Sequence, residues 1–135
     1  MAFANITAQF NTDLNTVWNI VTSLTDYEWR SDLSKIEMLE PGNKFIEYTK
    51  VGYATTFCIT VFEPQNRYEF DMDNSNMSGH WTGIFSEKNG MVHIDFTEDV
   101  TAKKLILKPF VKGFLKKQQA QYIRDLEAKI SSLTK

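Results

Sequence analysis

The chain reads LILKPFVKGFLKKQQAQYIRDLEAKISSL over residues 105–133, and this stretch indicates the fold more clearly than any other. Its apolar residues recur at spacings of three and four, which predicts one long amphipathic helix with Pro109 in its first turn. At ~1.5 Å per residue the helix would be about 40 Å long, which is close to the diameter of a domain. A single helix of that length needs a large apolar surface to lie on. The apolar positions are Leu107, Phe110, Val111, Phe114, Leu115, Tyr122, Ile123, Leu126, Ile130 and Leu133.

The segment before this helix offers such a surface, because turn signals divide it into short strands. Turns are predicted at residues 63–66, 74–76 and 88–90, and their regular spacing implies an antiparallel meander. The predicted strands cover residues 3–10, 36–39, 44–51, 54–62, 67–73, 77–86 and 91–100.

Alternation along the last three strands predicts a sheet with one apolar face and one polar face. Gly79 and Gly83 separate bulky side chains on that apolar face, which predicts an uneven surface with gaps. Around Tyr48 and Phe57 the alternation is too irregular to assign faces. The apolar face must be covered, and the long helix is its expected cover. The apolar face carries Tyr68, Phe70, Met72, Met77, Trp81, Phe85, Val92, Ile94, Phe96 and Val100.

Two short helices are predicted near the N-terminus. Residues 11–13, Asn-Thr-Asp, offer an N-cap for a helix that ends at about Thr22, and residues 25–26 open a second short turn or helix over residues 27–30. Together the elements predict an α+β fold, in which a curved antiparallel sheet wraps around a long C-terminal helix. Residues 1–135 would form a single domain.

The composition is that of an ordinary globular domain. Hydrophobic residues make up 42% and charged residues 24% of 135 residues, which argues against disorder. The net charge of -2 offers no reason to expect nucleic acid as a partner. The 13% of aromatic residues need a substantial apolar interior. The N-terminus has no secretory pattern and no apolar run approaches ~18 residues, so we expect a cytoplasmic protein without a transmembrane segment.

Few residues suit metal or redox chemistry. Cys58 is the sole cysteine, so it forms no intrachain disulfide and is expected to be a small core residue. His80 and His93 fall on the polar face and are expected to be exposed and non-catalytic. The spacing of these three residues predicts no metal site, and no motif predicts a cofactor.

The order of elements and several short motifs resemble the START-like, polyketide cyclase/dehydrase-like (SRPBCC) superfamily. The motifs are Val17-Trp18, residues 25–30, residues 36–39, Gly42, residues 63–70, Gly79-His80-Trp81 and Asn89-Gly90. The resemblance implies a helix-grip fold and a hollow between sheet and helix that binds an apolar small molecule. Members of the superfamily include lipid carriers, aromatase/cyclases and co-chaperone modules. The glycine-rich loop of the pollen-allergen branch is absent here, so its hormone-type ligands are not expected.

Given that resemblance, we expect a set of aromatic residues to line the cavity. The alternative is that these rings simply pack the core. The candidates are Trp29, Tyr68, Phe70, Trp81, Phe85, Phe96, Phe110 and Phe114.

Polar candidates accompany the aromatic ones. Glu98 continues the apolar series of its strand, where it could bind a ligand hydroxyl or act as a general acid or base. Alternatively, a bulge turns Glu98 to solvent, or it forms an ion pair at the rim. One of Gln118 and Gln119 is expected to face inward, toward a ligand, a strand or water. Tyr122 carries the same alternatives.

Residues 100–124 carry a charge of +7 and no acid, so the remainder carries -9. This segment is either a solvated helix face or a docking patch for an anionic group, an acidic partner or a membrane.

Three functional hypotheses follow. The first is a carrier for a hydrophobic small molecule or lipid. The second is a cyclase or dehydratase that uses Glu98, with Tyr122 or Tyr48 as the second proton-transfer group. The third is an interaction module that uses its basic helix face. The sequence leaves open whether the chain forms a homodimer.

Overall fold

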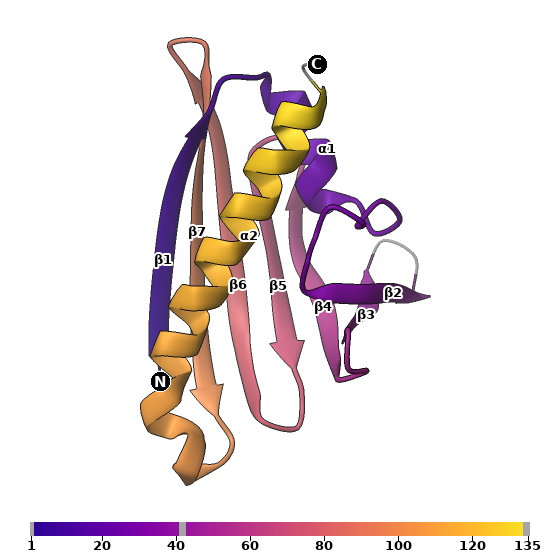
Figure 1. Cartoon of the computed structure of the whole chain (residues 1–135), viewed down its shortest axis with the longest axis vertical. Helices are drawn as coiled ribbons and strands as arrows, with labels where there is room; N and C mark the ends of the chain where they lie inside the picture. The colour runs from indigo at the N-terminus through magenta and orange to yellow at the C-terminus, as the bar shows by residue number, and fades with distance from the viewer. Residues whose placement is uncertain (1, 41–42, 134–135) are drawn as a thin grey trace.

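One antiparallel sheet of seven strands, in the order β1-β7-β6-β5-β4-β3-β2, forms the body of the computed structural model, which describes residues 2–40 and 43–133 (Figure 1). The strands from β2 to β7 form the expected meander. The last strand, β7, also pairs antiparallel with β1, the first strand of the chain. The strands are β1 (Ala2–Phe10), β2 (Leu33–Glu40), β3 (Lys44–Thr49), β4 (Ala54–Glu63), β5 (Arg67–Asp73), β6 (Met77–Lys88) and β7 (Met91–Ala102). Gly42, one of the motif residues, lies outside the described residues.

Helix α1 (Leu14–Thr22) begins where its capping residue predicts. The Asp13 carboxylate accepts hydrogen bonds from the backbone N–H of Thr16 at 2.7 Å and from its hydroxyl at 2.8 Å. The helix buries Val17, Trp18 and Ile20 at one end of the sheet.

Of the turn or helix predicted at residues 27–30, the turn is present and the second short helix is not. This segment consists of turns, with the N–H of Arg30 bonded to the carbonyl of Tyr27 at 3.0 Å. The Ser23 hydroxyl accepts from the N–H of Asp26 at 3.0 Å, in the manner of an N-cap, but no helix follows it.

The strand faces agree with the alternation for β5, β6 and β7. The expected gap beside Gly83 is filled, however, because the Trp81 indole lies over this glycine where a Cβ would clash with it. In β4 a register shift between Ile59 and Val61 explains the irregular alternation there. The extra residue allows both Phe57 and Phe62 to face the same side of the sheet.

The C-terminal helix starts later than predicted. Residues Leu105–Phe110 form a 3-10 helix, η1, and the α-helix α2 covers Val111–Leu133. Pro109 explains the difference, because it has no N–H to donate to the carbonyl four residues earlier. Helix α2 crosses the concave face diagonally and packs mainly over β1 and β7 (Figure 1). Its buried residues are Val111, Leu115, Gln119, Ile123, Leu126 and Ile130.

Candidate functional site

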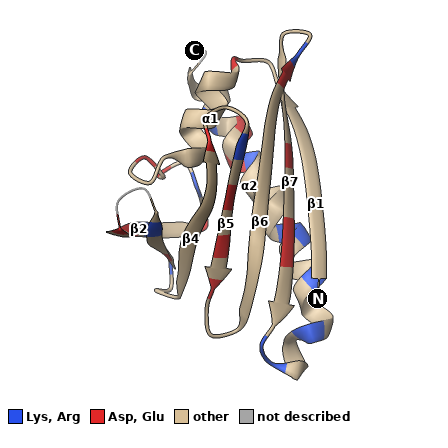
Figure 2. Ribbon diagram, turned by 180° about the vertical axis from the view of Figure 1, so that it is seen from behind, with Lys and Arg blue, Asp and Glu red and all other residues tan. Residues whose placement is uncertain are grey.

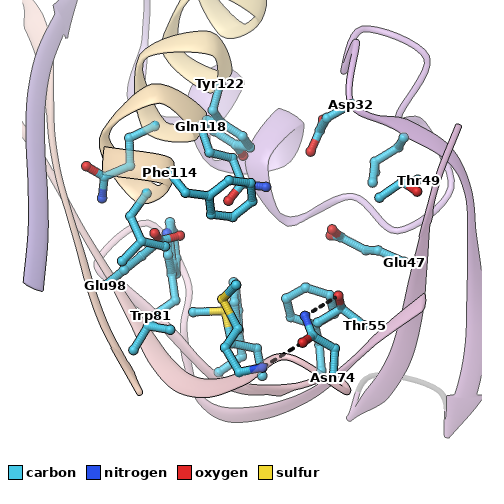
Figure 3. Close-up of a pocket in the computed structure, with 18 of the residues that line it drawn as sticks. Asp32, Glu47, Thr49, Thr55, Asn74, Trp81, Glu98, Phe114, Gln118 and Tyr122 are labelled. Atoms are coloured by element: carbon cyan, nitrogen blue, oxygen red, sulfur yellow. Dashed lines mark hydrogen bonds between the residues drawn. The ribbon is translucent and has the colours of Figure 1, made fainter. Parts of the chain in front are cut away.

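A cavity of about 600 Å³ lies between the concave face of the sheet and the cover formed by η1 and α2 (Figure 3). It exists because α2 packs over the β1–β7 side of the sheet, while the concave surface continues across β5, β4 and β3. Its volume falls within the ~300–1,000 Å³ typical of small-molecule sites.

Aromatic rings form the floor of the cavity. Phe45 stacks on Phe57 with centroids 5.0 Å apart, and Phe57 meets the edge of Phe70 at 5.1 Å. Phe70 in turn stacks on Trp81 at 4.8 Å, and Trp81 lies 4.7 Å from Phe96. Each ring therefore fixes its neighbour, so the floor is a preformed apolar surface.

The rim of the cavity consists of Val51, Phe110 and Phe114, which border it and are 92%, 67% and 50% exposed. They give the cavity an apolar entrance.

Most of the sequence-predicted site residues border the cavity. Trp29 and Phe85 do not. Trp29 packs edge-on against Tyr122 at 5.3 Å, behind the wall. Phe85 lies toward α1, where Trp18 contacts it at 4.9 Å, so it belongs to the closed core. The residues that border the cavity are Tyr68, Phe70, Trp81, Phe96, Glu98, Phe110, Phe114, Gln118 and Tyr122.

Glu98 points into the cavity (Figure 3). It lies opposite Trp81 and Ala4 in ladders that run without a register shift, so no bulge turns it to solvent. Its Oε2 is buried and has no hydrogen-bond partner among the described residues. Burial raises the pKa of Glu98 to about 7, with Glu47 adding to the rise and Arg30 opposing it.

The two glutamines of α2 divide their roles. Gln119 is buried, and its Nε2 donates to the carbonyl of Ala4 at 3.1 Å. Gln118 is exposed and borders the cavity beside Phe114 (Figure 3). Gln119 therefore fastens the helix to β1, and the amide of Gln118 stays available at the cavity wall.

A charged cluster on the far wall was missed from the sequence. The Arg30 guanidinium donates to Glu47 at 2.8 and 3.3 Å and to Asp32 at 2.9 and 3.2 Å. It also lies 5.2 Å from the ring centre of Tyr122. Burial alone would lower the pKa of Arg30, but the two carboxylates outweigh it and hold the pKa above its ordinary value. The sequence signal that could have revealed this cluster was Glu47. It lies two positions after Phe45, and therefore on the same face of a strand whose faces the alternation did not assign.

Several other candidates lie away from the cavity. Tyr48 donates to Glu37 at 3.2 Å on the outer side, so only Tyr122 remains as the proposed second proton-transfer group. Cys58 is half-buried and pairs with Lys44 and Asp71 on the outer face, so its predicted core position is wrong.

His80 and His93 lie on the outer face, as the alternation predicts. The ring nitrogens of His80 contact Asp71 at 2.7 Å and Glu69 at 2.6 Å. Burial lowers the pKa of His80, but these carboxylates outweigh it and raise the pKa above 6.5. Acidic residues of β5 and β7 are visible on this face in Figure 2.

The basic residues of the C-terminal segment gather on η1 and the first half of α2 (Figure 2). Lys103 pairs with Asp73 at 2.7 Å. Lys112 and Lys116 are exposed, and they lie two positions from Phe110 and Phe114 in the sequence. None of the helices within the described residues combines the length and apolarity needed to cross a membrane. No three His, Cys, Asp or Glu side chains in the described part of the chain converge as a metal site.

Comparison with solved structures shows that the chain shares its fold with a START superfamily protein and other solved proteins. A START superfamily protein from Mycobacterium smegmatis superposes with a TM-score of 0.87 at 11% identity, over 97% of this chain and 98% of that one. A conserved protein from Geobacillus kaustophilus gives 0.81 at 10% identity, over 96% and 95%. DynU16, a protein in the dynemicin biosynthetic locus, gives 0.79 at 10% identity, over 97% of this chain and 48% of that one.

By sequence, no protein-family model and no curated protein matches. The similarity therefore lies in the fold: the chain has the START-like helix-grip fold, with the long helix and curved sheet that the motifs predict.

Proposed function

We propose that the protein binds a hydrophobic small molecule or lipid in the cavity beneath η1 and α2. The observation that carries the proposal is the preformed aromatic floor of an open cavity of about 600 Å³. A ligand that buries ~300 Å² of apolar surface there would gain about 7 kcal/mol before association costs.

Neighbouring threonines on β4 provide a matched test. Thr55 borders the cavity, whereas Thr56 faces the outer side, and both are half-buried. Thr55→Trp would fill part of the cavity with an indole, and Thr56→Trp would add the same ring outside it. The binding of Nile red, a neutral apolar dye, is measured by fluorescence titration for each variant.

We expect Thr55→Trp to weaken Nile red binding by about tenfold or more, a loss of about 1.4 kcal/mol, and Thr56→Trp to leave it unchanged. Native mass spectrometry of the freshly purified protein should also detect a co-purifying apolar molecule. Equal binding by the two variants, or no dye binding by the wild type, would contradict the proposal.

A second candidate function is catalysis of the cyclase or dehydratase type. It is favoured by the buried Glu98 carboxyl, whose pKa of about 7 suits proton transfer near neutral pH, and by Tyr122 in the same cavity. The test is turnover of a linear poly-β-ketone thioester. The hypothesis predicts that the wild type turns this substrate over. It also predicts that Glu98→Gln binds the substrate with the same affinity but does not turn it over.

An interaction module with a solid interior is the least supported of the three, because the apolar space under the helix is open.

A further inference from the structure

Acidic residues outnumber basic residues among those that border the cavity. Among the described residues they are one cation, Arg30, and four acids, Asp32, Glu47, Asp73 and Glu98. An anionic head group that entered the cavity would therefore need Arg30 as its partner.

Arg30 is already occupied. A guanidinium has five N–H donors, and four of those of Arg30 point to the carboxylates of Asp32 and Glu47. One positive charge thus faces two negative ones at this wall, and its pairing with Glu47 is mostly shielded from solvent, with 15% of each side chain exposed. A ligand carboxylate would have to displace a paired carboxylate to reach the cation.

Glu98 presents the opposite chemistry. Figure 3 places it across the open space from Glu47 and Asp32. Its buried Oε2 accepts no hydrogen bond from a described residue. Burial without a donor is unfavourable for this carboxyl group, and a ligand donor that bonds the carboxyl from the cavity side would offset that penalty.

We propose, building on the binding function above, that the cavity selects hydrophobic molecules that carry a hydrogen-bond donor, protonated amines before alcohols, and that it discriminates against carboxylates. The ligand's apolar part lies on the aromatic floor, and its donor group bonds the Glu98 carboxylate. The cluster of Arg30 with Asp32 and Glu47 adds negative potential, which favours a cation and repels an anion.

Three ligands that differ only in the head group test this selection. Dodecylamine, dodecanol and dodecanoate are titrated against Nile red bound to the intact protein at pH 8, where Glu98 is mostly ionised, and below their aggregation concentrations. We expect dodecylamine to bind about tenfold or more tighter than dodecanoate, with dodecanol between them.

The variant Glu98→Gln should bring the amine and the carboxylate to within about threefold of each other, because it removes the charge that distinguishes them. Glu87→Gln removes an exposed carboxylate at the end of β6, away from the cavity, and should preserve the wild-type order.

The outcomes separate the two proposals. If dodecanoate binds as tightly as dodecylamine, or none of the three displaces bound Nile red, head-group selection is overturned while the binding function stands. If Nile red itself does not bind, both proposals fail. The wild-type series is informative by itself, so the test does not depend on how Glu98→Gln folds.

Discussion

The side-chain amide of Gln119 donates a hydrogen bond to the backbone carbonyl of Ala4, 3.1 Å away and 115 residues earlier in the chain. β1 is an edge strand, so part of its backbone has no neighbouring strand to bond with. Gln119 satisfies one of those carbonyls and holds the cover helix to the sheet.

Replacing Gln119 by Ala should therefore destabilise the protein by about 1–3 kcal/mol, because a buried acceptor loses its donor. Gln118→Ala, one position away on the exposed side, should change the free energy of unfolding by less than about 0.5 kcal/mol. Urea denaturation of both variants measures the difference. Equal effects would mean that the bond contributes nothing specific.

The raised pKa of Glu98 predicts a pH-dependent stability. Its pKa is about 7 in the folded protein and 4.5 in the unfolded chain, so the folded state binds the proton more tightly. The contribution of Glu98 to stability is most favourable below pH 4.5 and falls as pH rises from 4.5 to 7, by up to about 3 kcal/mol.

The variant Glu98→Gln lacks this titration, so it should be more stable than the wild type by about 2–3 kcal/mol at pH 8 and nearly equal to it at pH 4.5. Urea unfolding at the two pH values measures the gain. A gain of the same size at both would show that packing, rather than ionisation, distinguishes the two proteins.

The rim should affect binding more than stability. Phe114 borders the cavity and is 50% exposed, while Leu133 is 53% exposed at the other end of α2. Phe114→Ser should weaken Nile red binding about threefold or more because part of the ligand's apolar contact is lost, whereas Leu133→Ser should not. Thermal melts should place both variants close to the wild type. If both variants lower the affinity, the rim has no particular role.

Two glycines predict opposite effects of the same substitution. A Cβ at Gly83 would clash with the Trp81 indole, so Gly83→Ala should destabilise the protein by about 1–3 kcal/mol and disturb the cavity floor. At Gly113, inside α2, a Cβ meets open space, and Gly113→Ala should stabilise by about 0.5–1 kcal/mol. Chemical denaturation measures the change in the free energy of unfolding for each variant. If Gly83→Ala leaves this free energy unchanged, the Trp81 indole moves aside without cost.

The sequence by itself determined the elements and much of the fold. Alternation assigned the faces of β5, β6 and β7, and the capping residues at 11–13 located the start of α1, because these signals depend on neighbours a few residues apart. Turn residues separated the strands, and the spacing in residues 105–133 identified a long helix that must lie on the sheet, although its first six residues form a 3-10 helix. Glu98 was recognised as a polar group on an apolar face for the same local reason.

Only the tertiary structure decided where the cavity lies and what charges face it. The bulge in β4 and the pairing of Arg30 with Glu47 result from contacts between separate segments of the chain. The helix also packs over one side of the sheet rather than its middle, and this leaves the space under η1 and α2 open. Periodicity specifies the face of the sheet to which a side chain points. The residues that it contacts on that face depend on how the sheet curves and where the helix crosses it.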